Sequence, residues 1–249
     1  MELYHLILMI VVFAATSVIG VVTGSNSLIT VPIMFQFGVA PKVALATNMF
    51  GLTFMNIGAT LPFVRSGSLR VDKLKPLIII TLVGSSIGAL LVGWLKSEWI
   101  PVIVVVSMVL VSLFIIFNGT GAKSAGRFDS PIITFALTFF LGIYGGVYSG
   151  GYVTILTAVL AAFYGFTFTE AIAGTKLINI FSSGIATVIF AVQGLIDYKL
   201  GVILAATMFV FANLGARIVT RLSDVWLRRI FLSAVILLAI KTLFDYTLN

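Results

Sequence analysis

The chain contains no cysteine and a single histidine, His5, and only 9% of its 249 residues are charged. The absence of cysteine excludes disulfides, thiolate nucleophiles and cysteine-ligated metal sites. A charge content this low, with 60% hydrophobic residues, excludes a water-soluble domain of this length, because too little polar material is available to cover its surface. We therefore expect an all-α polytopic membrane protein with no soluble catalytic or nucleic-acid-binding domain.

Carboxylates are also missing from the apolar segments. Seven of the eight acidic residues lie in or beside polar loops or at the termini: Glu2, Asp72, Glu98, Asp129, Asp197, Asp224 and Asp245. The eighth, Glu170, borders an apolar segment and is predicted to mark a helix start. Without a pair of buried carboxylates the sequence offers no hydrolytic centre, proton relay or metal site, so we expect neither enzyme activity nor a metal or other cofactor.

What the sequence does have is two series of apolar segments in the same order. The first series spans residues 4–22, 27–37, 43–64, 76–95 and 99–117, and the second spans 131–148, 152–164, 170–193, 200–222 and 226–246. The second segment of each series is shorter than the roughly 20 residues that a membrane-spanning helix needs. This order predicts a first repeat over residues 1–117, a polar connection over 118–130 and a second repeat over 131–249.

Residue identities support a duplication. A shift of 127 positions places Gly24 on Gly151, Thr30 on Thr157, Gly38 on Gly165, Thr60 on Thr187, Gly67 on Gly194 and Gly88 on Gly215. With one inserted residue in the middle, the same comparison brings Thr47-Asn48 opposite Thr175-Lys176. The matches keep their order along both halves, which favours an internal repeat.

The basic residues predict that the two repeats are inverted. The 64–76 loop holds four basic residues, whereas its counterpart at 193–200 holds one basic and one acidic residue. The next loop reverses this bias, because residues 217–229 are rich in arginine. Since Lys and Arg concentrate on the cytoplasmic side, the 64–76 loop, the 118–130 connection and the 222–226 turn are expected inside. The 95–99 and 193–200 turns and both termini are then expected outside.

An inverted repeat must cross the membrane an odd number of times, which requires the first two segments of each half to form a hairpin. A continuous helix over 4–37 would be about 51 Å long at 1.5 Å per residue, far more than the roughly 30 Å hydrocarbon core. We therefore expect helix–break–helix hairpins at 4–37 and 131–164, with breaks at residues 23–27 and 149–152. Helices that begin after such breaks point free N–H groups and a positive dipole end into the protein, which suits an anion.

Lys176 is the one basic residue far from any predicted loop. A charged side chain at membrane depth costs at least about 2.5–3.5 kcal/mol unless a partner or a watery cavity receives it, and the natural partner here is an anion. The alternative is that Lys176 extends towards the membrane surface near Glu170. Gly84, Gly88, Gly142 and Gly215 are instead interpreted as contacts between closely packed helices.

We expect a substrate site near the midplane, between the two hairpins. Its candidate residues come from the two breaks and from the polar stretches of the helices that follow: Ser25, Asn26, Ser27, Thr47, Asn48, Gly150, Gly151, Tyr152, Thr175, Lys176, Asn179 and Ser182. Lys176 would supply the positive charge and the others hydrogen bonds.

These stretches resemble the TauE/SafE sulfite exporter (TSUP) family. The resemblance rests on Gly20 to Pro32, Ala173-Gly174-Thr175-Lys176-Leu177, Gly194-Leu195-Ile196-Asp197, Gly215-Ala216-Arg217 and Leu227-Arg228-Arg229. The first break, Gly24-Ser25-Asn26-Ser27-Leu28, has fewer glycines than is usual in the family.

The resemblance implies a multi-pass inner-membrane protein of a bacterial or archaeal cell that exports sulfite, thiosulfate or an organosulfonate such as sulfoacetate. Its partners would then be this anion and the lipid bilayer, without nucleic acid, and a homodimer is compatible with the sequence. An anion channel and a membrane scaffold or assembly factor without a ligand are the alternatives.

Overall fold

The computed structural model describes residues 3–24, 26–118, 130–219, 221 and 226. In this part of the chain all regular structure is helical: α1 (Leu3–Thr23), α2 (Ser27–Gln36), α3 (Pro41–Arg65), α4 (Val71–Trp94), α5 (Trp99–Asn118), α6 (Pro131–Val147), α7 (Tyr152–Phe163), α8 (Phe168–Val192) and α9 (Tyr198–Val219). The all-α prediction is confirmed. The predicted segment 226–246, the 222–226 turn and most of the 118–130 connection lie outside the described residues.

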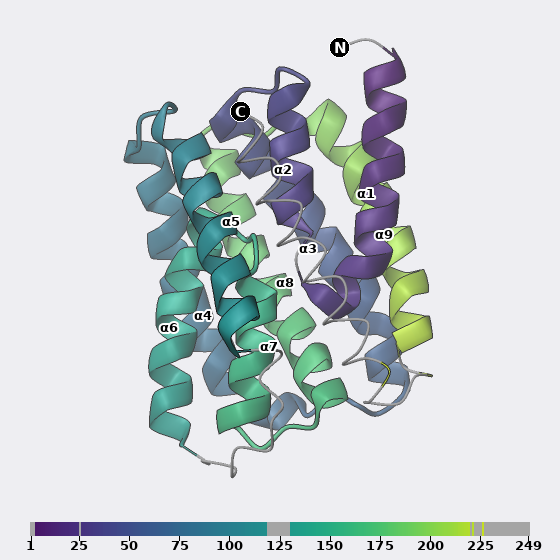
Figure 1. The fold of residues 1–249 in the computed structure, drawn as a ribbon, viewed down its shortest axis with the longest axis vertical. Coiled ribbons are helices and arrows are strands. Elements are labelled where there is room, and N and C mark those ends of the chain that lie inside the picture. The colour runs from purple at the N-terminus through teal and green to yellow at the C-terminus, as the bar shows by residue number, and fades with distance from the viewer. Residues whose placement is uncertain (1–2, 25, 119–129, 220, 222–225, 227–249) are drawn as a thin grey trace.

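Both predicted hairpins are present. Figure 1 shows α1 running from one end of the molecule to its middle, where the chain breaks and α2 returns to the same end. From the opposite end, α6 rises to the middle and α7 returns. The breaks lie between Thr23 and Ser27 and between Val147 and Tyr152, as the sequence predicted.

The long helices that follow the hairpins, α3 and α8, run antiparallel. Arg70, just after the end of α3, forms a salt bridge with Glu170 in the first turn of α8, with 2.6 Å between Arg70 Nε and Glu170 Oε1. At the other end, the backbone N–H of Asp197, after α8, donates to Thr47 Oγ1 near the start of α3 at 3.1 Å. Glu170 also forms a capping box with Thr167, which confirms that it marks a helix start.

Helix boundaries and backbone angles repeat after 127 residues. α3 and α8 each have 25 residues, and α8 begins and ends 127 positions after α3. The described glycines with positive φ form three pairs with the same spacing: Gly24 and Gly151, Gly38 and Gly165, and Gly67 and Gly194. Because a positive φ strongly favours glycine, each pair marks the same chain reversal in both halves.

The same spacing holds in the middle of the long helices. Thr30 Oγ1 donates to Asn48 Oδ1 at 2.8 Å, and the hydroxyls of Thr157 and Thr175 are 2.9 Å apart. Thr175 therefore corresponds to Asn48, and Lys176 corresponds to Met49. The one-residue insertion inferred from the sequence is wrong, since both helices keep the register of 127.

The glycines that were interpreted as packing residues lie at close helix contacts. A Cβ on Gly84 would lie 2.6 Å from the Phe139 carbonyl oxygen, and one on Gly88 would lie 2.1 Å from that of Ile143. A Cβ on Gly215 would lie 2.7 Å from the Val18 carbonyl oxygen. Close backbone approach through small residues is typical of membrane helices, so this interpretation is confirmed.

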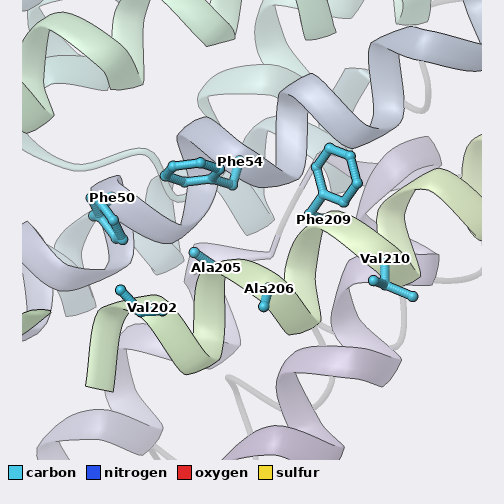
Figure 2. Close-up of a pocket in the computed structure, with 7 residues that line it drawn as sticks. All are labelled: Phe50, Phe54, Val202, Ala205, Ala206, Phe209 and Val210. Carbon is cyan, nitrogen blue, oxygen red and sulfur yellow. The ribbon is translucent and has the colours of Figure 1, made fainter. Parts of the chain in front are cut away.

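The outer surface suits a lipid environment. Four described helices, α1, α4, α8 and α9, are long and apolar enough to cross a membrane. Between α3 and α9, Figure 2 shows a groove whose lining residues are all apolar: Phe50, Phe54, Val202, Ala205, Ala206, Phe209 and Val210. The groove has a volume of about 390 Å³ and offers no polar group to a ligand, so it is suited to lipid chains and not to an anion.

Candidate substrate site at the helix breaks

The two hairpin breaks contact each other in the middle of the molecule. Thr154 Oγ1, from the first turn of α7, donates to the Thr23 carbonyl oxygen at 2.5 Å. The Tyr148 hydroxyl, from the second break, donates to the Ser27 carbonyl oxygen at 2.9 Å. The structure thus brings together the two broken segments that the sequence predicted to form one site.

Lys176 reaches this junction from α8. Its side chain is 1% exposed, and its Nζ donates to the carbonyl oxygen of Gly20 at 2.7 Å. Gly20 lies in the last turn of α1, where the helix dipole is negative and favours a cation. No Asp or Glu of the described residues lies within salt-bridge distance of Lys176. Lys176 is therefore directed into the protein at the first break, and not towards Glu170.

The first break contributes a compact set of buried polar side chains. Asn48 Nδ2 donates to Ser27 Oγ at 2.9 Å, and Asn48 Oδ1 accepts from Thr30. Asn26 is the N-cap residue of α2, and its Nδ2 lies 3.2 Å from Met55 Sδ. Asn26 Oδ1 is buried and accepts no hydrogen bond from the described residues.

The second break faces a group of hydroxyls. Gly151 is the N-cap residue of α7, and Gly150 accepts a hydrogen bond from the Tyr144 hydroxyl. Tyr152 is fully buried, and its hydroxyl forms no hydrogen bond in the described part of the chain.

Further along α8, the Ser182 and Ser85 hydroxyls are 2.7 Å apart, and Ser85 donates to the Gly142 carbonyl oxygen. Asn179, between Lys176 and Ser182, keeps its buried Oδ1 without a donor in the described structure. The hydroxyls therefore continue a polar line along one face of α8.

Two of the predicted residues lie differently, and a third is not described. Thr47 accepts from Asp197 at the 193–200 turn, and Thr175 pairs with Thr157 between α7 and α8, so both hydroxyls already have partners. Ser25 lies outside the described residues.

Sequence reasoning did not find several groups at the junction: the Gly20 carbonyl and the side chains of Met55, Thr81, Ser85, Tyr148 and Thr154. Tyr148 and Thr154 flank the second break, and this proximity is the signal that could have identified them.

A comparison with known protein families identifies the family of this chain. The family model described as "Sulfite exporter TauE/SafE" matches residues 8–242, which is nearly the whole chain. The chain belongs to this family. The resemblance seen in the sequence is confirmed, and the protein is a membrane transporter of the TauE/SafE type.

Curated relatives agree with the TauE/SafE assignment. The chain is 25% identical over 226 residues to "Probable membrane transporter protein YfcA" of Escherichia coli (strain K12), covering 90% of this chain and 84% of that protein. It is 25% identical over 231 residues to a "Probable membrane transporter protein" of Haemophilus influenzae, covering 92% and 91%. It is also 25% identical over 247 residues to "Probable membrane transporter protein ORF9" of Sinorhizobium sp, covering 98% and 95%. No solved structure matches the chain.

In this TauE/SafE protein the junction has the chemistry of a closed polar site. Neither N-cap residue, Asn26 or Gly151, caps its helix with a side chain. In α2 the Ile29 N–H donates to the Asn26 carbonyl oxygen, and in α7 the Tyr152 N–H donates to the Ser149 carbonyl oxygen, so part of each first turn is already paired. The described residues contain no cluster of His, Cys, Asp or Glu that could hold a metal ion. The junction therefore combines one buried lysine with buried hydroxyl and amide groups.

Proposed function

We propose that this protein exports a small sulfur-containing anion, such as sulfite, thiosulfate or sulfoacetate, bound at the junction of the two breaks. The observation that carries the proposal is the buried ammonium of Lys176 at this junction, without a carboxylate partner in the described structure. An unpaired charge at membrane depth is costly, and an anionic substrate would compensate it.

The helix termini support the sign of the substrate charge. α2 and α7 both begin at the junction, and their positive dipole ends favour an anion. Broken helices at matching places in two halves are the expected location of a transporter site. The sulfur chemistry rests on the family description, since sulfite exporters give the TauE/SafE family its name.

Counterflow in proteoliposomes tests this function. Vesicles with purified protein, loaded with unlabelled sulfite, thiosulfate or sulfoacetate, should take up the same labelled anion faster than unloaded vesicles. Sulfate, acetate and chloride serve as comparison anions. Saturable counterflow supports a transporter, flux without counterflow would indicate a channel, and the absence of both binding and flux for every sulfur anion would contradict the proposal.

We also propose that the two halves form an inverted repeat with both termini outside the cell membrane. The antiparallel α3 and α8 and the 127-residue spacing of the positive-φ glycines support it. The charges support it too. α3 and α9 run parallel, so both helices end on the same side of the molecule. That side carries the basic residues Arg65 and Arg70, as expected for a cytoplasmic side.

This orientation predicts a labelling pattern that the cysteine-free chain makes simple to measure. Single exposed cysteines at Ser97→Cys and Lys199→Cys should react with a membrane-impermeant maleimide on whole cells. Ser66→Cys, in the 64–76 loop, should react only after the membrane is opened, because the basic loop is expected inside. Labelling of Ser66→Cys and Lys199→Cys from the same side would contradict the inverted repeat.

A further inference from the structure

The Lys176 ammonium has one acceptor in the described structure, and two buried amide oxygens belong to neighbouring residues. Lys176 Nζ lies 2.7 Å from the Gly20 carbonyl oxygen. Asn26 adjoins Gly20, since a Cβ on Gly20 would lie 3.2 Å from the Asn26 Cβ. Asn179 lies one turn beyond Lys176 on the same face of α8. The Oδ1 atoms of Asn26 and Asn179 are both buried and have no donor in the described structure.

This set of groups has the chemistry of a cation site. A helix C-terminus and side-chain amide oxygens present negative partial charge, which attracts a cation. In transporters with broken helices, unwound carbonyls and half-helix C-terminal ends coordinate the coupling cation, while half-helix N-termini face the anionic substrate. Here Gly20 belongs to a helix C-terminal end, which is the kind of group that binds the cation. α2 and α7 begin with helix N-termini, which are the kind of group that faces the anion.

We infer that the Lys176 ammonium is a tethered cation that occupies a cation-binding position at the C-terminal turn of α1, next to the unpaired amide oxygens of Asn26 and Asn179. The transporter therefore binds its anion next to a built-in positive charge and takes no free metal cation with it. This second statement rests on the proposed function; the occupancy of the position by an ammonium does not.

The matching position in the first repeat supports this assignment. Met49 occupies the place that corresponds to Lys176 and is equally buried, and Leu52 and Met55 correspond to Asn179 and Ser182. The charge and the polar line next to it are therefore present in one repeat only. A single tethered cation is therefore built into the site, and the matching position of the first repeat is apolar.

Chemical rescue tests the occupancy directly. Lys176→Ala removes the ammonium and leaves space, so methylammonium or ethylammonium should enter and raise the Tm of the purified variant by at least about 3 °C at saturating amine. Wild-type protein should not respond, because the position is filled. Lys176→Met should not respond either, because its side chain fills the same volume.

Lys42→Ala is the matched control. Lys42 Nζ also donates to a backbone carbonyl, that of Gly93 at 2.9 Å, but it lies away from the breaks and is partly exposed. The amine should raise the Tm of Lys176→Ala more than that of Lys42→Ala or Lys176→Met. An equal or smaller rise in Lys176→Ala would overturn the tethered-cation assignment. If Lys176→Ala is unfolded, recovery of folded protein during purification with ethylammonium supports the assignment. Failure of that recovery would overturn the assignment.

The wild-type protein tests the independence from metal cations. Counterflow of thiosulfate should change by less than about fivefold when Na⁺ is replaced by K⁺ or by N-methyl-D-glucamine, because a coupled cation typically changes affinity by about 5–150-fold. A larger loss without Na⁺ or K⁺ would overturn this inference and leave the proposed function intact. Absence of flux for every sulfur anion would instead contradict the proposed function, while the amine rescue still decides the occupancy.

Discussion

Lys176→Met is expected to abolish anion binding and counterflow while the protein remains folded. Lys176 is buried at the junction of the breaks, and its ammonium donates to the Gly20 carbonyl oxygen in the last turn of α1. Truncating one partner of a buried charge pair typically costs about 2–5 kcal/mol, which corresponds to a loss of anion affinity of about 30-fold or more. Methionine keeps the volume and is stable in a lipid environment, so size-exclusion profile and Tm should stay close to wild type.

Two further variants make the result specific. Lys176→Arg should retain part of the activity, because a planar guanidinium keeps the charge but does not fit the place of a compact ammonium. Met49→Leu changes the corresponding position of the first repeat and should transport like wild type. The measurement is isothermal binding and counterflow of the best anion in the substrate panel. Normal transport by Lys176→Met would falsify the role of Lys176 in the site.

The hairpins and their breaks could be predicted from the sequence because they follow from two local signals. Segments 27–37 and 152–164 are too short to span the membrane, and each is preceded by a small polar cluster. The paired glycines Gly24 and Gly151 added the second signal, since their positive φ requires glycine. Lys176 was identifiable for a similar reason, because a charge inside an apolar run is costly wherever the fold places it.

The direction of individual side chains could not be predicted in the same way. Thr47 and Asn48 are adjacent on α3, and consecutive helical residues point about 100° apart, so they do not face the same group. Thr47 contacts the turn after α8, whereas Asn48 contacts Ser27 in the first break. An assumed insertion of one residue then assigned Lys176 to the wrong partner position.

Contacts between the two repeats were also beyond sequence reasoning. The bond from Tyr148 to Ser27 and that from Thr154 to Thr23 join segments more than a hundred residues apart. Their formation depends on how α3 and α8 pack, and no periodicity in the sequence determines that packing. The Gly20 carbonyl was missed because a backbone acceptor has no sequence signature.

Gly24→Ala is expected to separate the two breaks and to abolish transport. Gly24 has a φ of 67°, and a Cβ at this position would lie 2.6 Å from Val153 Cγ1 and 2.8 Å from the backbone nitrogen of Thr154. The left-handed conformation costs a non-glycine residue about 1–2 kcal/mol, and overpacking adds about 1–3 kcal/mol. The clashing nitrogen of Thr154 belongs to the backbone of α7 and cannot rotate away. The strain is therefore relieved only when α7 moves away from the first break, which breaks the hydrogen bond from Thr154 to Thr23.

Gly38→Ala is the matched control for this effect. Gly38 has a similar φ of 78°, but a Cβ there would meet nothing within 4 Å, so it carries the conformational cost alone. Gly38→Ala should therefore lower the Tm by a few degrees and retain transport, whereas Gly24→Ala should lose both folded yield and counterflow. The comparison is made by Tm, size-exclusion profile and counterflow of the same anion in parallel. Equal effects of the two substitutions would contradict the inference that contact between the breaks is required, because only the shared backbone conformation would then explain the loss.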